Sequence, residues 1–95
     1  DEMEIPPMKK WDGKYRVVLF DIPENLKKAR DAFARTLKQI GMMPLQKSVF
    51  VHPFDCKKEL DFVINFFRLG PYIHIIVADE IDNEAEILRH FDIRK

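Results

Sequence analysis

An unbroken apolar run at positions 17–20, with the sequence Val-Val-Leu-Phe, constrains the fold of this chain more than any other stretch. Because the run is rich in β-branched and aromatic residues, it predicts a buried strand, which we place at 15–22. Pro23 ends the strand, since proline has no N–H to donate to a sheet. Asp21 therefore stands where a buried strand opens into a loop. A carboxylate at such a place either caps the following helix, pairs with a nearby base or takes part in chemistry.

Two amphipathic helices are expected further along the chain, at about 26–40 and 54–69. Gly41 ends the first helix, Asp55 is a good N-cap for the second, and Gly70 ends it. The second helix is apolar over a wide arc. That arc is broader than one sheet needs, which points to a partner or a covering tail.

Two more extended regions are expected at 42–53 and 72–78. Pro44 demands an irregular or edge position in the first, which allows two short paired strands. Strand, helix, one or two strands, helix and strand then follow one another. This order predicts an α+β fold, a ferredoxin-like βαββαβ sandwich with an antiparallel sheet and a short C-terminal helix.

The domain boundaries follow from these elements. We expect the ferredoxin-like domain at 14–80, an N-terminal lead-in or linker at 1–13 and a tail helix within 81–95. The predicted strands are apolar on both faces, whereas an antiparallel sheet with one wet face should alternate. We therefore expect the second face to be covered, and the hypothesis is a homodimer that packs sheet against sheet.

The charge of the chain is unevenly distributed, although its net value is zero. Residues 9–58 hold twelve Lys and Arg against five Asp and Glu, and 59–95 hold four against eight. The basic half permits an anionic partner, or it is a solvated surface. The only cysteine is Cys56, which suits a reducing cytosol, and no apolar run is long enough for a membrane span. We expect a cytoplasmic protein with no membrane partner.

One family resemblance rests on the string 17–22, on the basic helix that ends at Gly41, and on 46–50. Together they resemble the small CRISPR-associated spacer-adaptation proteins, often described as metal-dependent endonucleases. The resemblance covers about 14–80 and implies a ferredoxin-like homodimer in antiviral defence. It also implies that Asp21 is the catalytic and metal-binding acid, with Mg²⁺ shared between two copies of Asp21 across a two-fold axis.

The same resemblance implies contacts with nucleic acid, either duplex DNA or RNA. In that family the dimer can bind DNA without cleavage and bridge integrase-type adaptation subunits. The residues then expected at phosphates are Lys27, Lys28, Arg30, Arg35, Lys47 and Ser48. Phe20 stands where the family often has Tyr, so a hydroxyl is missing beside Asp21.

A second resemblance is equally close. The string 10–24, with 51–55, looks like the middle domain of PaaX-type transcriptional repressors, where a related fold lies between a winged helix and a C-terminal segment. This alternative implies a dimerisation and effector-coupling domain, with Asp21 structural and DNA bound by a winged helix outside this chain. The lack of an initial Met and the acidic lead-in with Pro6-Pro7 then suggest a domain of a longer protein.

Other classes of function find less support. The glycine that RNA-recognition modules place in an aromatic-rich strand is missing from 47–51. No nucleophile–base triad, phosphate-binding glycine loop or cofactor fingerprint stands in the sequence. His52 has no second His or Cys at metal-site spacing, so we interpret it as a structural histidine.

Overall fold

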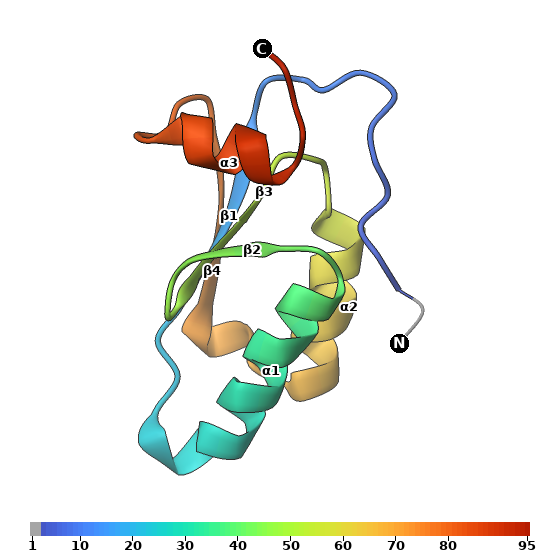
Figure 1. Ribbon diagram of the computed structural model, residues 1–95. Coiled ribbons are helices and arrows are strands. Elements are labelled where there is room, and N and C mark those ends of the chain that lie inside the picture. The colour runs from blue at the N-terminus through green and yellow to red at the C-terminus, as the bar shows by residue number, and fades with distance from the viewer. Residues whose placement is uncertain (1–2) are drawn as a thin grey trace.

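A four-stranded antiparallel sheet organises the computed structural model, which describes residues 3–95 (Figure 1). The elements are β1 (Tyr15–Phe20), α1 (Lys27–Gln39), β2 (Met43–Gln46), β3 (Val49–His52), α2 (Lys57–Phe67), β4 (Ile73–Ala78) and α3 (Glu84–His90). Short 3₁₀ helices at Glu24–Leu26 and Gly70–Tyr72 precede α1 and β4. The strand order is β2-β3-β1-β4, and every neighbouring pair is antiparallel. The predicted ferredoxin-like α+β fold is confirmed.

The apolar run predicted to be a buried strand forms β1, in the interior of the sheet between β3 and β4. The strand ends at Phe20, two residues earlier than predicted. Phe20 is opposite Ile73, the first residue of β4, so the ladder has no partner beyond that point. One further main-chain bond remains, from the Asp21 N–H to the Tyr72 carbonyl at 3.0 Å.

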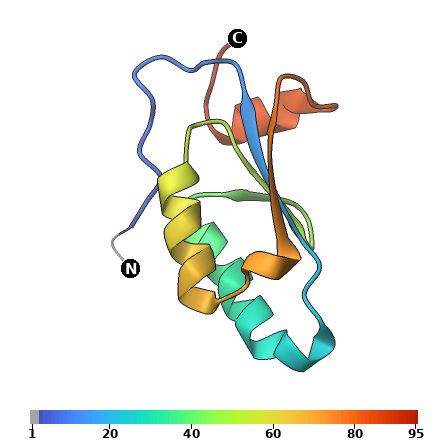
Figure 2. The ribbon, with the colours of Figure 1, turned by 180° about the vertical axis from the view of Figure 1, so that it is seen from behind.

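The main core lies between one face of the sheet and the helices α1 and α2, which cover that face together (Figures 1 and 2). Phe20 and Phe50 point into it from the strands, while Phe33 and Leu60 come from the two helices. The Phe20 and Phe33 rings meet edge to face, with centroids 5.2 Å apart. Burial of apolar and aromatic side chains such as these is the dominant favourable contribution to folding.

The opposite face of the sheet has its own, smaller cluster. Tyr15, Val17 and Val51 pack there against Ile87 of α3, and all four are buried. Figures 1 and 2 show α3 lying against the sheet on the side away from α1 and α2. The sequence predicted that a second copy of the chain would cover this face. At the end of the sheet near Tyr15, the chain's own helix α3 covers it instead.

The predicted ends of α2 need correction. Cys56, not Asp55, is the N-cap residue, although an Asp55 carboxylate oxygen accepts a hydrogen bond from the Lys57 N–H at 3.2 Å. The helix ends at Phe67, because Arg68 takes a left-handed conformation with φ 57°. This turn directs Leu69 into the core, where it is buried.

The wide apolar arc of α2 stays partly uncovered. Phe62 and Phe66 are 60% and 70% exposed. Part of the N-terminal lead-in does pack on the core: Ile5 is buried, and its N–H donates to the Ile40 carbonyl at 2.9 Å. Residues 1–2 of the lead-in lie outside the described residues. Within 3–95, none of the helices has the length and apolar character that a membrane crossing requires.

Candidate functional site

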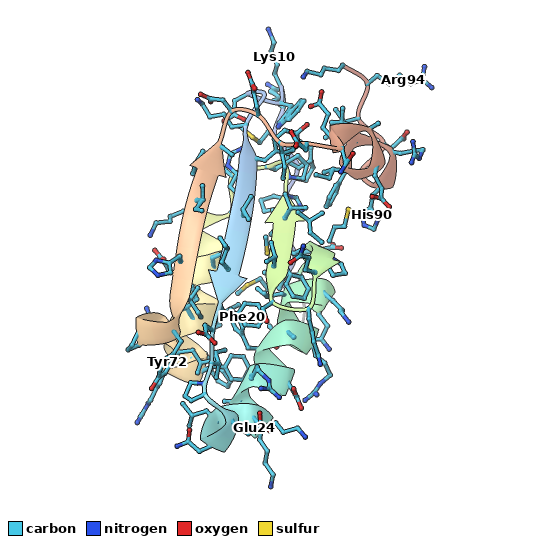
Figure 3. The ribbon with its side chains drawn as sticks, turned by 90° about the vertical axis from the view of Figure 1, so that its left-hand side faces the viewer. Lys10, Phe20, Glu24, Tyr72, His90 and Arg94 are labelled. Atoms are coloured by element: carbon cyan, nitrogen blue, oxygen red, sulfur yellow. The ribbon has the colours of Figure 1, made fainter. Side chains whose placement is uncertain are left out.

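Asp21 occupies the loop that leaves β1, where the strand reaches Phe20 and the chain continues to Glu24 (Figure 3). Its side chain is exposed. Neither the 3₁₀ helix that follows nor α1 receives a capping hydrogen bond from a side chain. Among residues 3–95, no base forms an ion pair with Asp21. The structure thus contradicts both structural roles considered for this carboxylate, helix capping and ion pairing.

A shallow pocket adjoins Asp21 at this end of the sheet. Leu19 and Val49 contribute its apolar wall, and Ser48, Tyr72 and His74 contribute polar groups. A main-chain hydrogen bond joins the end of β1 to the turn between β2 and β3, because the Phe20 N–H donates to the Ser48 carbonyl at 3.1 Å. Ser48 therefore lies beside Asp21.

A second and larger groove runs between α1 and the hairpin formed by β2 and β3. Its cations come from both walls, from α1 and from the hairpin: Lys27, Arg30, Arg35, Lys38 and Lys47. Two carboxylates, Glu24 and Asp31, oppose them. We call this feature the α1 groove. Ser48 lines both the α1 groove and the pocket beside Asp21, so the two hollows adjoin.

The structure brings together all but one of the residues predicted to contact nucleic acid. Lys28 lies on α1 but does not line the α1 groove, whereas its neighbour Lys27 does. Lys38 belongs to the groove and was absent from the predicted set. The sequence spacing could have identified Lys38, since it follows Arg35 by three residues and so lies on the same helix face.

The cations of the α1 groove differ in how far they are neutralised. Arg30 lies 3.3 Å from Glu24 and 3.5 Å from Asp31, so its charge is locally balanced. The other four, Lys27, Arg35, Lys38 and Lys47, form no ion pair with any residue in 3–95. The groove therefore carries an excess of unpaired positive charge on a chain whose net charge is zero.

The sequence of this chain matches a known protein family. Residues 8–88 match the model of the PaaX protein central Cas2-like domain. The chain belongs to this family. Comparison with curated proteins gives no match. The family description joins the two resemblances seen in the sequence, because it places a Cas2-like domain, with its ferredoxin-like fold, at the centre of PaaX proteins.

Among the described residues, a single copy of this PaaX central domain does not supply a complete set of metal ligands. Mg²⁺ prefers octahedral coordination by oxygen, usually with more than one carboxylate or with substrate phosphates. In the part of the chain that the structure describes, no three His, Cys, Asp or Glu side chains are arranged to hold a metal ion. Asp21 is one isolated carboxylate. Its metal-binding and catalytic roles stay predictions that need ligands from outside this chain.

His52 lies in a buried polar cluster away from both hollows. Its Nδ1 accepts a hydrogen bond from the Phe54 N–H at 3.1 Å, and its ring packs 4.7 Å from the Phe91 ring. Burial, together with the positive charge of Arg16 and the nearby His90, lowers the pKa of His52 to about 4. A buried, neutral imidazole with a main-chain partner fits the structural interpretation of this residue.

Arg16 is the charged centre of that cluster. Its guanidinium donates to Asp12 at 2.6 and 3.0 Å and to the Pro53 carbonyl at 2.8 Å. The hydrogen bond from Arg16 lowers the pKa of Asp12 below its usual value. The turn before β1 is thereby joined to the loop that leads into α2, and the cluster has a structural role.

Proposed function

We propose that this chain is the self-associating, coupling domain of a PaaX-type transcriptional regulator. The observation that carries the proposal is the match of residues 8–88 to the central domain of PaaX proteins. Endonuclease activity, by contrast, would need ligands beyond the single Asp21 carboxylate of each chain, because one carboxylate is a poor site for metal-assisted hydrolysis.

The surface for self-association is the part of the second sheet face that α3 leaves open, together with the edge of β4. Leu19 and Val49 are half-buried there, and Ile76 is 47% exposed. Val77, also on β4, is 58% exposed. Figure 3 shows β4 at the margin of the sheet, beside β1. An apolar edge strand without charge or proline invites pairing, and a two-fold copy would cover both the edge and the open face.

A matched pair of substitutions tests this surface. We expect Ile76→Lys to convert a dimer to a monomer in analytical ultracentrifugation at micromolar concentration, because a charge would be buried in the contact. Phe66→Lys is the control, since Phe66 is equally apolar and 70% exposed but lies on α2. Its variant should remain dimeric. A monomeric wild-type chain, or dissociation by Phe66→Lys alone, would contradict the proposed surface.

A metal-dependent endonuclease acting beside an integrase-type subunit is the second candidate. The specific observation in its favour is the exposed, unpaired carboxylate of Asp21 beside Ser48. In a dimer, the second copy of Asp21 would supply the further carboxylate that one chain lacks. Mg²⁺ held there would lower the pKa of a bound water and stabilise charge on a phosphate.

The test is cleavage of duplex DNA and single-stranded RNA with Mg²⁺ or Mn²⁺, using wild type and Asp21→Ala. On this second candidate, cutting depends on the ion and is lost in Asp21→Ala. Asp82→Ala removes a control carboxylate that is exposed and lines neither hollow, and this variant should keep full activity. Absence of cutting by the wild-type dimer would remove the endonuclease from consideration and leave the regulatory domain.

A further inference from the structure

Two phenylalanines on α2 form an apolar patch that no other part of residues 3–95 covers. Phe62 and Phe66 are largely exposed and lie four residues apart, so their rings are neighbours on the helix surface. The opposite side of the helix, with Leu60 and Val63, packs into the main core. We call Phe62 and Phe66 the α2 patch. Adjacent exposed rings, unlike scattered ones, form a continuous surface that another apolar surface can cover.

The area of the α2 patch indicates how its partner is held. An aromatic side chain buries about 150 to 250 Å² when it is fully covered, so the exposed parts of the two rings amount to roughly 250 Å². A partner that binds from solution needs about 800 Å² on each side, of which somewhat more than half is apolar. A domain of the same polypeptide needs less, because its effective concentration is on the order of millimolar. The patch therefore fits a tethered domain better than a free protein or a second copy.

The N-terminal lead-in reaches the main core on the side of the sheet that α2 covers. Ile5 is buried there, its N–H donates to the Ile40 carbonyl at 2.9 Å, and Met3 packs on the same core. Figures 1 and 2 both show the lead-in running beside α2. Lys95, by contrast, pairs with Glu84 of α3, on the other face of the sheet. A domain attached before the lead-in is therefore within reach of the α2 patch, whereas one attached after Lys95 starts from the far side.

The charges around the α2 patch indicate the chemistry of the surface that covers it. Lys57 and Asp61 pair with each other at 2.9 Å. Lys58, Glu59 and Arg68 have no ion-pair partner among residues 3–95, so two cations stand against one carboxylate. A complementary surface is therefore apolar at its centre and carries carboxylates at its margin.

We propose that the α2 patch is the docking site for the domain that precedes residue 1 in the parent PaaX-type regulator. Phe62 and Phe66 pack on an apolar surface of that domain, and Lys58 and Arg68 face its acidic margin. The inference rests on the proposed function and deepens it, since it names the helix through which the coupling domain holds its neighbour. A central domain of PaaX proteins has polypeptide on both sides, and the position of the lead-in selects the preceding side.

The test measures how fast a maleimide reacts with a cysteine placed beside the α2 patch. Asn65 is exposed on α2 and gives the reporter variant Asn65→Cys, which keeps both phenylalanines. Asp82, exposed in the loop before α3, gives the control variant Asp82→Cys. Both are made in the 95-residue chain and in the parent protein, and mass spectrometry identifies the labelled peptide. The native Cys56 is fully buried, so it reacts only if the domain unfolds.

We expect Asn65→Cys to react at least about tenfold more slowly in the parent protein than in the 95-residue chain, because the docked domain covers it. Asp82→Cys should react equally fast in both. Adding Phe62→Ser and Phe66→Ser to the parent protein should restore the fast reaction of Asn65→Cys. Adding Ile76→Lys, which acts on the proposed dimer surface, should leave the protection unchanged at every protein concentration.

Four results would overturn the proposal. Equal rates of Asn65→Cys in the two proteins would show that the α2 patch stays open. Protection that Ile76→Lys removes, or that rises with protein concentration, would assign the patch to a second copy. Protection that survives Phe62→Ser and Phe66→Ser would place the contact away from the patch. A parent gene that encodes no domain before residue 1 would leave the patch without the proposed occupant.

Analytical ultracentrifugation of the same samples keeps this inference separate from the proposed self-association. A dimeric parent protein with a fast-reacting Asn65→Cys rejects the docking alone. A monomeric parent protein with a protected Asn65→Cys rejects only the proposed dimer.

Discussion

At the scale of single residues, side chains that look equivalent in the sequence have different surroundings in the structure. Lys27 and Lys28 are adjacent and equally charged, yet only Lys27 lines the α1 groove. Arg30 and Arg35 are on the same helix, yet only Arg30 is paired with acids. Asp21 was the carboxylate of greatest interest, and it is exposed and without a side-chain partner in 3–95. For each of these residues, the surroundings decide which chemistry is available.

His52 gives a prediction about pH at this scale. Its pKa is lowered from 6.5 to about 4 in the folded chain, so between these values the unfolded chain binds more protons. Stability contributed by neutral His52 is therefore complete above about pH 6.5 and is lost as the pH falls toward 4. We expect the free energy of unfolding to decrease by on the order of 2 kcal/mol across this window, measured by urea unfolding.

The control for this prediction is His74, which is exposed on β4. His74→Gln is the comparison variant, and it should keep the decrease in the free energy of unfolding that His52 produces between pH 6.5 and 4. His52→Gln should flatten the profile between pH 6.5 and 4, whatever its effect on stability at neutral pH. A His52→Gln profile as steep as that of the wild type would assign the pH dependence to other groups.

At the scale of elements, sequence patterns predicted which segments form helices and strands better than they predicted where those segments end. Val-Val-Leu-Phe at 17–20 dictates a buried strand, but β1 ends where β4 no longer provides a partner. Pro44 stands in the edge strand β2, with a register shift between Pro44 and Gln46, as the missing N–H requires. The end of α2 depends on burial of Leu69, which no local pattern around Gly70 reveals.

The attachment of α3 is an element-scale prediction. The Tyr15 hydroxyl donates to Glu84 at 2.6 Å, and Lys95 pairs with the same carboxylate at 3.1 Å. We expect Tyr15→Phe to lower the midpoint of thermal unfolding by roughly 5 °C, because a partly buried bond to a charged acceptor is lost while the ring stays packed. Amide hydrogen exchange should speed up in α3 and remain slow in α1.

The control for the α3 attachment is Lys95→Ala. The Lys95 side chain is 61% exposed, and exposed ion pairs contribute little, so the melting midpoint should hardly move. A larger effect from Lys95→Ala than from Tyr15→Phe would show that the terminal ion pair, and not the tyrosine, holds α3 on the sheet.

At the scale of the whole molecule, the two faces of the sheet are covered by different elements. The side covered by α1 and α2 holds the main core, and the α1 groove lies at its margin beside the hairpin. The other side is closed by α3 at one end and keeps Leu19, Val49 and Ile76 accessible at the other. The open end of this face meets the α1 groove at Ser48, which lines both the groove and the pocket beside Asp21.

The sequence by itself determined the ferredoxin-like order of elements, because hydrophobic periodicity and the positions of proline and glycine act within a few residues along the chain. It also determined that the region around α1 is basic and that Asp21 follows a buried strand. Only the tertiary structure decided that α3 covers part of the second face, that Lys47 joins the cations of α1, and that Asp21 has no side-chain partner in 3–95. Each of these depends on contacts between segments far apart in sequence, which are fixed by packing around the common core and leave no trace in local spacing.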